Sequence, residues 1–413
     1  MRILIDQSGY ELLNIGDVAM LQSCVTRLRQ HWPGARIMVI AHDPGRLAAY
    51  CPGTTAIGRV FADRPLARLL PPRPRLAAEQ AWKMAGPYAA RQPGGLARPP
   101  RTAVQAVRAA DLVVASGGGY LTDTFWWHAA GVLSLLSLAQ RLGKPTAMFG
   151  QGLGPLRSRA LRGQAGAVLP RLAVLGLREG RTGPGLARSL GVPPGTVTVT
   201  GDDALELAGQ AAAPGAAALG FNLRVSSYAG LDGAAAAAVG EVVLGAAREL
   251  SAPVIALPVS RYAADGDAGA LRAMPAARRG ARIEVADLDS PAALQAATAG
   301  CRAVVTGSYH AAVFSVALGI PAVCLTRSAY YQAKFGGLEA QFPGACQLVA
   351  LDRPGWAAAL RAGITRAWQL PPGDRAAARA AASRLRTAGQ DAYARLREVA
   401  TPPAAALYRD PRR

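Results

Sequence analysis

The chain has 413 residues, 51% of them hydrophobic and 17% charged, which excludes an intrinsically disordered chain and predicts two domains rather than one core. Basic residues outnumber acidic residues by 46 to 26, a net charge of +20 that suits an anionic substrate or membrane surface, although a GC-rich coding sequence also enriches arginine. Because the arginines are scattered and aromatic residues make up only 6%, we expect no nucleic-acid partner.

Short apolar runs that end in Gly or Asp alternate with longer stretches of helical period, a pattern typical of parallel strands joined by crossover helices. In the first half we predict helices at 17–31 and 129–142 and strands at 2–5, 36–40, 112–115, 145–150, 173–177 and 197–199. In the second half we predict a helix at 311–318 and strands at 219–223, 254–257, 283–285, 303–306 and 322–325. The sequence therefore predicts an α/β fold of two doubly wound, Rossmann-like lobes that face a cleft.

The boundary between the lobes is predicted in the stretch 209–218, which is rich in Ala, Pro and Gly, lacks charge and has the composition of a linker. The N-terminal lobe then spans 1–208 and the C-terminal lobe 219–372, followed by a helix at 373–400 and a frayed tail at 401–413. Residues 65–100 contain many prolines and predict an irregular excursion over the surface.

Several glycine-rich and charged segments follow the strands of the first half. Asp17, in Asn14-Ile15-Gly16-Asp17, could cap the next helix or bind a ligand. Gly117-Gly118-Gly119, with Asp123 after it, could form an anion cradle or only a tight turn, and it lacks the spacing of dinucleotide and P-loop motifs. Gly150-Gln151-Gly152-Leu153-Gly154-Pro155 predicts a second such turn. Arg178-Glu179, upstream of Gly201-Asp202-Asp203, could line the cleft or pair at the surface.

The second half places its candidate residues at two strand ends. Arg224 ends one strand, and Ser308-Tyr309-His310 lies where the next helix begins, a place where amide groups can hold an anion or where a histidine is merely structural. Lys334 is one of three lysines in a chain that uses arginine almost everywhere else, which hints that an ammonium group is wanted there. His31 and His42 rank below His310. His128 follows an aromatic trio, 125–127, that could stack on a sugar but is expected to pack in the core.

The N-terminus and the cysteines predict a cytoplasmic protein. Residues 1–6 have the pattern of a strand rather than that of a signal peptide, and no apolar run reaches the roughly 18 residues that a membrane span needs. The five cysteines show no CxxC pair and no zinc spacing with histidine, so we expect reduced, buried thiols and no metal site. Contact with the inner face of the membrane would be peripheral.

In order and spacing, these motifs resemble the polysaccharide pyruvyl transferase family over about residues 1–340. The resemblance rests on Asn14-x-Gly16-Asp17, Gly117-Gly118-Gly119 with Asp123, Gly150-Gln151-Gly152, Arg178-Glu179, Gly201-Asp202, Arg224 and Gly307-Ser308-Tyr309-His310. It implies a glycosyltransferase-B-like pair of lobes and transfer of pyruvyl from phosphoenolpyruvate to two hydroxyls of a sugar as a ketal. No cofactor is implied beyond phosphoenolpyruvate as co-substrate.

The resemblance also implies roles for single residues. His310 would be the general acid or base, and Asp17 or Asp123 would orient the sugar hydroxyls. The donor would be bound in the C-terminal lobe by Arg224, Lys334, Ser308 and Tyr309. The acceptor side of the cleft, in the N-terminal lobe, would be lined by Asn14, Gly117, Gly118, Gly119, Gln151 and Arg178. The partners implied are phosphoenolpyruvate and a sugar or lipid-linked glycan of the cell surface.

Two departures from the family pattern keep other functions open. Some members have Ser-x-Arg-x-His where this chain has Ser308-Tyr309-His310, and Ala311 stands where glycine is usual. One alternative is a glycosyltransferase that uses a nucleotide sugar, for which Glu339 is the nearest acidic residue available to a ribose. The other is a non-catalytic glycan-binding or assembly protein that keeps the fold.

Overall fold

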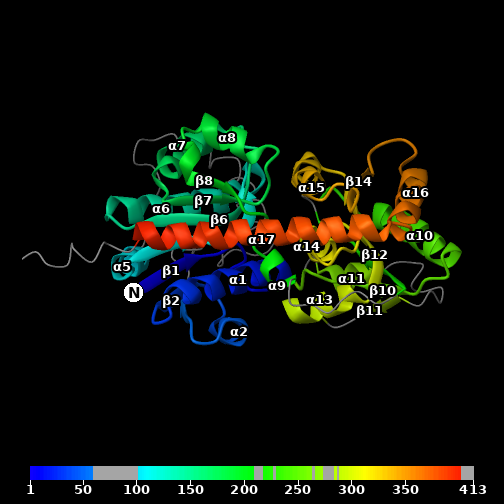
Figure 1. Ribbon diagram of the computed structural model, residues 1–413, viewed down its shortest axis with the longest axis horizontal. Coiled ribbons are helices and arrows are strands. Elements are labelled where there is room, and N and C mark those ends of the chain that lie inside the picture. The colour runs from blue at the N-terminus through cyan, green and yellow to red at the C-terminus, as the bar shows by residue number, and fades with distance from the viewer. Residues whose placement is uncertain are drawn as a thin grey trace, which may run out of the picture.

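The computed structural model describes residues 1–58, 101–208, 217–226, 229–262, 266–272, 283–285 and 288–400. These residues form two lobes, each with its own parallel sheet, that lie side by side along the long axis of the molecule (Figure 1). Most of the predicted linker, the proline-rich excursion at 65–100 and the tail at 401–413 lie outside the described residues.

The sheet of the N-terminal lobe has the strand order β3-β2-β1-β4-β6-β7-β8, and its neighbours pair in parallel. Its strands are β1 (Arg2–Asp6), β2 (Arg36–Ile40), β3 (Thr55–Ile57), β4 (Leu112–Ala115), β6 (Thr146–Leu153), β7 (Val174–Leu177) and β8 (Val197–Val199). A further short strand, β5 (Gly118–Leu121), pairs with β6 off this path. The six predicted strands are confirmed to within a few residues, whereas β3 and β5 were not predicted.

The sheet of the C-terminal lobe has the order β11-β10-β9-β12-β13-β14 and is also parallel. Its strands are β9 (Ala218–Asn222), β10 (Val254–Ala256), β11 (Ile283–Val285), β12 (Cys301–Thr306), β13 (Ala322–Thr326) and β14 (Cys346–Ala350). Strands β4, β9 and β13 are buried along their whole length, as expected for a parallel sheet covered by helices on both faces. The five predicted strands are confirmed, and β14 was missed.

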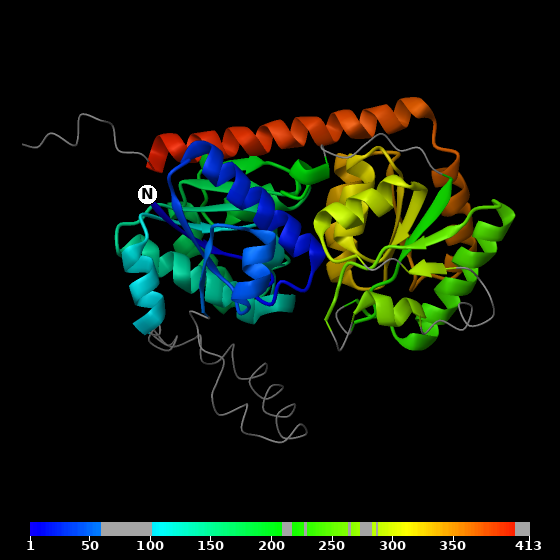
Figure 2. The same ribbon diagram turned by 90° about the horizontal axis from the view of Figure 1, so that it is seen from below.

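Helices cover both faces of each sheet (Figure 2). Those of the N-terminal lobe are α1 (Ile15–His31), α2 (Pro44–Tyr50), α5 (Arg101–Ala109), α6 (Trp126–Arg141), α7 (Arg159–Val168), α8 (Gly183–Ser189) and α9 (Leu205–Ala208). Those of the C-terminal lobe are α10 (Gly233–Glu249), α11 (Asp267–Arg272), α13 (Pro291–Ala299), α14 (Tyr309–Ala317), α15 (Ala329–Gln341) and α16 (Trp356–Trp368). The predicted helices at 17–31, 129–142 and 311–318 correspond to α1, α6 and α14.

The last helix, α17 (Pro372–Ala400), runs across both lobes and ties them together (Figures 1 and 2). It packs on α14 of the C-terminal lobe and on α1, β7 and β8 of the N-terminal lobe. Beneath it Arg27 is fully buried, 3.3 Å from Asp203 and 2.9 Å from Glu206, with its guanidinium 5.3 Å from the ring of Tyr393. A helix was predicted at 373–400, but its return over the first lobe was not.

Candidate active site

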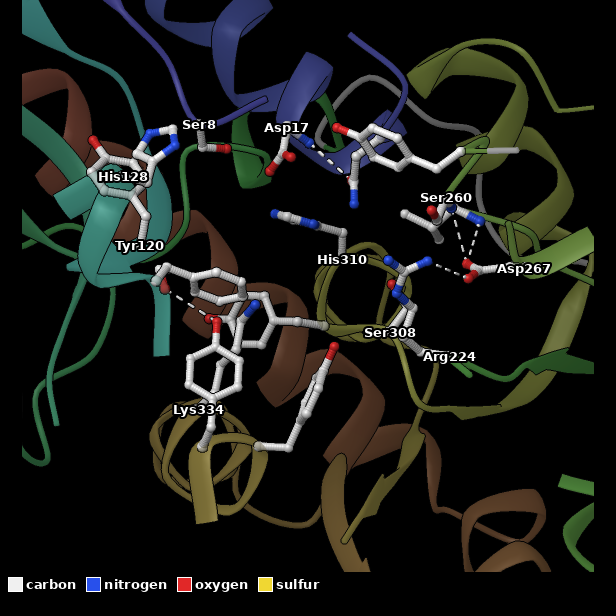
Figure 3. A pocket seen from close by; sticks show the side chains of 18 residues that line it. Ser8, Asp17, Tyr120, His128, Arg224, Ser260, Asp267, Ser308, His310 and Lys334 are labelled. Atoms are coloured by element: carbon white, nitrogen blue, oxygen red, sulfur yellow. Dashed lines mark hydrogen bonds and ion pairs between the residues drawn. The ribbon is translucent and has the colours of Figure 1, made fainter. Parts of the chain in front are cut away.

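A cavity of about 330 Å³ lies between the lobes and is lined by side chains from both (Figure 3). Eight of the predicted site residues line it: Asn14, Asp17, Gly119, Arg224, Ser308, Tyr309, His310 and Lys334. Phe125 and His128, which were discussed from the sequence, also line it, and eight further lining residues were not predicted: Ser8, Tyr120, Val259, Ser260, Tyr262, Asp267, Tyr330 and Tyr331. The carboxyl ends of strands in two sheets therefore converge on one pocket, as α/β folds generally arrange their ligand sites.

The N-terminus of α1 brings Asp17 to the pocket. Asn14 is the N-cap of this helix, because its side-chain oxygen accepts hydrogen bonds from the amides of Gly16, at 3.0 Å, and Asp17, at 3.3 Å. The alternative in which Asp17 is itself the cap is therefore wrong, and its carboxyl group faces the cavity instead. Burial raises the pKa of Asp17, and the positive charges of Lys334, Arg178 and Arg224 offset part of that rise.

His310 lies in the first turn of α14, and its ring packs against α1 of the other lobe. A Cβ atom placed on Gly16 would lie 1.9 Å from Nδ1 of His310, so only glycine leaves room for the imidazole. Burial lowers the pKa of His310 well below its usual value, and the charges of Lys334 and Arg178 lower it further. The imidazole is thus neutral near pH 7 when the pocket holds no anion.

Lys334, on α15, is held among tyrosine rings. Its ammonium nitrogen lies 4.8 Å from the ring centroid of Tyr309, 5.5 Å from that of Tyr330 and 5.8 Å from that of Tyr331, all within cation–π range. Burial and the nearby charge of Arg178 lower the pKa of Lys334 to about 7, although Asp17 and Asp202 act in the opposite direction. This lysine can therefore gain or lose its charge near neutral pH, which an arginine could not do.

Arg224 follows β9 and is oriented by Asp267, which the sequence reasoning missed. Nη1 of Arg224 lies 3.1 Å from one carboxylate oxygen of Asp267. The other oxygen accepts hydrogen bonds from Asn222 and from the amides of Val259 and Ser260, at 2.9 to 3.0 Å. Asp267 comes 43 residues after Arg224 with no motif to link them, so only the fold reveals the pair.

Arg178 lies behind the pocket wall rather than in it. Its guanidinium is buried and stacks on the ring of Tyr309, 4.4 Å from the centroid, so it supports that wall from behind. Cβ atoms on Gly119 and Gly152 would come within 2.6 and 2.4 Å of this guanidinium, which explains both glycines. Glu179 does not pair with Arg178 at the surface, because its carboxylate accepts hydrogen bonds from the amides that open α8.

The two glycine-rich segments lie largely in strands, which corrects the prediction of a turn at each. Residues 118–121 form β5, and the second segment continues β6 as far as Leu153. Their glycines make room for neighbouring side chains: a Cβ on Gly117 would lie 2.7 Å from the sulfur of Met20, and one on Gly118 would lie 2.4 Å from the ring of Tyr120. Gln151 donates hydrogen bonds to Ser116 and, at 2.7 Å, to the hydroxyl of Tyr120, which holds that ring at the cavity.

Asp123 is not among the residues that line the cavity, although it was predicted to orient the acceptor. Its two carboxylate oxygens accept hydrogen bonds from the amides of Arg157 and Ser158, where α7 begins. A carboxylate used in this way fixes a loop, so the structure gives Asp123 a tethering contact rather than a place at the pocket.

His128 lines the cavity from the N-terminal lobe, among aromatic rings. Its ring stacks on Tyr10 at 5.0 Å and lies 4.5 Å from Tyr120. Of the aromatic trio before it, Phe125 lines the cavity and meets Tyr330 edge-on, whereas Trp127 is 47% exposed. The expectation that the trio packs in the core thus holds only in part.

Across the described ranges, no group of three or more His, Cys, Asp or Glu side chains is arranged to hold a metal ion. Within the same ranges, no helix has both the length and the hydropathy to cross a bilayer.

Two parallel α/β lobes with a shared pocket place the chain in the class of glycosyltransferase-B folds. It is similar to the UDP-GlcNAc 2-epimerase of Methanocaldococcus jannaschii (TM-score 0.54, 10% identity, 89% of this chain and 92% of that chain). It is also similar to S. aureus MnaA in its UDP co-structure (TM-score 0.56, 12% identity, 90% of this chain and 90% of that chain). A third similar structure is Arabidopsis thaliana UGT89C1 in complex with quercetin (TM-score 0.58, 11% identity, 97% of this chain and 98% of that chain). At these identities the likeness shows the fold alone.

The family is shown by sequence. The family model of polysaccharide pyruvyl transferase matches residues 14–329, about three quarters of the chain, and the chain belongs to this family of transferases. The resemblance inferred from the motifs is therefore confirmed. A comparison with curated proteins finds no match.

Proposed function

We propose that the protein transfers pyruvyl from phosphoenolpyruvate to a pair of hydroxyls on a sugar of a cell-surface glycan or its lipid-linked precursor. The observation that carries this proposal is the position of His310 in the pocket. Figure 3 shows it with Asp17 on one side, Lys334 on the other and the Arg224–Asp267 pair close by. An acid–base group thus lies among two cations and a carboxylate, in a pocket built from both lobes.

The cations suit a donor with two anionic groups. Phosphoenolpyruvate carries a phosphate and a carboxylate, and Arg224 offers a guanidinium whose direction Asp267 already fixes. Lys334 adds a second positive charge, and the fraction of molecules that carry it depends on pH near neutrality, since the pKa of Lys334 is about 7. A bound dianion would favour the ammonium form of Lys334, so donor binding and protonation of this lysine reinforce each other.

The reaction balances without a further reactant. A proton adds to the methylene carbon of phosphoenolpyruvate, which becomes the methyl group, and the adjacent carbon becomes an oxocarbenium-like centre. One sugar hydroxyl adds to that centre and loses its proton. The phosphate group then leaves as its C–O bond breaks, and the second hydroxyl closes the ketal. Of the two hydroxyl protons, one replaces the proton used on the methylene carbon and the other leaves with phosphate.

His310 can serve as acid and then as base in this sequence. In the empty pocket it is neutral because its pKa lies well below the usual value. The negative charges of bound phosphoenolpyruvate raise that pKa, so the donor complex can hold the imidazolium. This imidazolium gives its proton to the methylene carbon, and the neutral ring then takes the proton of the attacking hydroxyl.

We expect the acceptor at the end of the cavity that the N-terminal lobe forms. Asp17 can accept a hydrogen bond from a sugar hydroxyl and orient it toward the reacting carbon. The rings of Tyr120 and His128 offer the apolar faces on which sugar rings stack. With a net charge of +20, peripheral contact with an anionic membrane would bring the protein to a lipid-linked acceptor.

Glu339, the residue on which the nucleotide-sugar alternative depended, makes its hydrogen bond away from the cavity. Its carboxylate accepts a hydrogen bond from the amide of Leu348 at 3.2 Å, and it is not among the residues that line the cavity. This contact speaks against a ribose-binding role. Thermal-shift measurements compare the donors directly: phosphoenolpyruvate should raise the melting temperature more than UDP or dTDP does.

The test of the proposed function is the variant His310→Ala. Phosphate release from phosphoenolpyruvate, measured with a panel of lipid-linked sugars, should fall to background. The control is His31→Ala, since His31 ends α1 and is not among the lining residues of the pocket. Unchanged turnover in His310→Ala would remove the basis of the assignment.

A further inference from the structure

Three enclosed polar atoms, from His310, Asp202 and Arg178, meet near the imidazole ring of His310. Oδ2 of Asp202 lies 3.8 Å from Nε2 of His310 and 3.9 Å from Nη1 of Arg178. Each of these atoms is enclosed and has no hydrogen-bond partner in the described structure. Buried polar atoms rarely stay unpaired, so a cluster of three points to an interaction that forms during the working cycle.

The carboxylate of Asp202 is held so that one oxygen is aimed at this cluster. Asp202 lies three residues after the end of β8, and its Oδ1 accepts a hydrogen bond from the amide of Ala204 at 2.9 Å. Its side chain is only about 1% exposed, and it is not among the residues that line the cavity. Asp202 therefore cannot touch a ligand there, and any effect on the reaction must pass through His310 or Arg178.

We propose that Asp202 is a positioning residue that accepts a hydrogen bond from Nε2–H of His310 and so leaves Nδ1 as the nitrogen that exchanges protons with the substrates. The hydrogen bond between Asp202 and His310 does not depend on the proposed function; only proton exchange between Nδ1 and the substrates rests on it. At 3.8 Å the bond is not yet made, and the ring must approach Oδ2 by about 1 Å to reach the usual length of a charge-assisted hydrogen bond. Nδ1, the other ring nitrogen, lies against Gly16 at the start of α1, where Asn14 and Asp17 line the cavity.

The charges around His310 show why this bond matters. Besides burial, the charges of Lys334 on α15 and of Arg178 after β7 lower the pKa of His310 and so disfavour a second cation there. Arg224 after β9 adds a further positive charge at the cavity. The opposing carboxylates are Asp17 on α1 and Asp202 after β8. Asp202 is thus the carboxylate placed to stabilise the imidazolium from the side that the substrates do not occupy. The Nε2–H bond persists while Nδ1 gives its proton to the methylene carbon and takes one from the hydroxyl.

The kinetic test uses Asp202→Asn, which keeps the shape and removes the charge. At saturating phosphoenolpyruvate, kcat should fall at least tenfold, with a much smaller change in KM for the donor. Because the donor complex needs the imidazolium, the alkaline limb of the kcat profile should move to lower pH by about one unit or more, the usual effect of an opposite charge at this range. Asp202→Glu should restore part of the lost kcat and bring the alkaline limb part of the way back to its wild-type pH.

The control is Asp203→Asn, which changes the neighbouring buried carboxylate that pairs with Arg27 rather than facing His310. It should lower the melting temperature and leave the alkaline limb where it is. If Asp202→Asn also only lowers stability, with an unshifted limb, Asp202 has a structural role and the proposal fails.

A second measurement does not depend on activity or on any variant at position 202. In protein labelled with ¹⁵N-histidine, the ring nitrogens of His310, assigned by comparison with His310→Ala, should show the proton on Nε2 and none on Nδ1 in the neutral form. A proton on Nδ1 instead overturns the positioning proposal. A proton on Nε2 in a protein that turns over no phosphoenolpyruvate supports the positioning role and rejects pyruvyl transfer, so the two proposals fail separately.

Discussion

Gly16→Ala should disable the site while leaving the fold intact, because His310 packs directly on the backbone of residue 16. The added Cβ would lie 1.9 Å from Nδ1 and 2.0 Å from Cγ of the imidazole. Real Cβ atoms keep about 3.4 Å or more from their neighbours, so the ring or the start of α1 must move by about 1.5 Å. The backbone of residue 16 is helical, so alanine itself is well tolerated there.

A displacement of this size is large on the scale of catalysis, where a misplacement of about 1 Å can cost roughly a hundredfold in rate. We therefore expect kcat of Gly16→Ala to fall by about a hundredfold, with a change of melting temperature of only a few degrees. The matched control is Gly163→Ala on α7, where the new Cβ meets nothing within 4 Å. It should retain full activity and gain slightly in stability. If Gly16→Ala has normal kcat with phosphoenolpyruvate and acceptor, the contact between His310 and α1 has no catalytic importance.

Two further predictions concern the charges of the molecule. KM for phosphoenolpyruvate should rise with pH above about 7, because the pKa of Lys334 is about 7 and the ammonium is lost above it. In Lys334→Arg this pH dependence of KM should vanish. A wild-type KM that stays flat from pH 6 to 8.5 would contradict the prediction. Arg27→Met should lower the free energy of unfolding, measured with urea at pH 8, by about 3 kcal/mol, because it leaves the buried carboxylate of Asp203 and the partly buried carboxylate of Glu206 without their cation. Burial already raises the pKa of Asp203 to about 7, above its unfolded value, so the native state binds the extra proton and the loss should shrink as the pH falls below 7; a loss independent of pH would show that lost packing dominates.

The fold could be predicted from the sequence where strands are buried on both faces. Strands such as β4, with the sequence Leu-Val-Val-Ala, leave continuous apolar runs, since all of their residues are buried. The missed strands lack this signal. β3 has three half-exposed or exposed residues, β14 mixes buried and half-buried positions, and β5 begins with two glycines that resemble a turn. Their pairing depends on neighbours that are distant in sequence.

The site was predictable to the extent that its residues follow strands. Asp17, Arg224 and His310 come at or soon after strand ends, and parallel sheets bring such residues to one edge. The same rule misplaced Asp123, because it cannot tell whether a carboxylate faces a ligand or an amide of its own chain. Asp267 was beyond reach for the opposite reason, since its role comes from a contact with Arg224 that has no fixed spacing. Asp202 was named in a motif, but its place beside His310 could not be predicted from the sequence.

The integrity of the pocket depends on how the two lobes are packed together. Tyr330 of α15 donates a hydrogen bond to the carbonyl of Gly119 in β5, and Asn14 bridges to Ser260 across the same boundary. His310 completes this contact by lying on α1, whereas α17 packs on α1 and α14 from the outside. Because Asp17 and His310 belong to different lobes, a small rotation between the lobes would separate these two side chains. The long helix over both lobes therefore stabilises the relative placement of these two side chains as well as the fold.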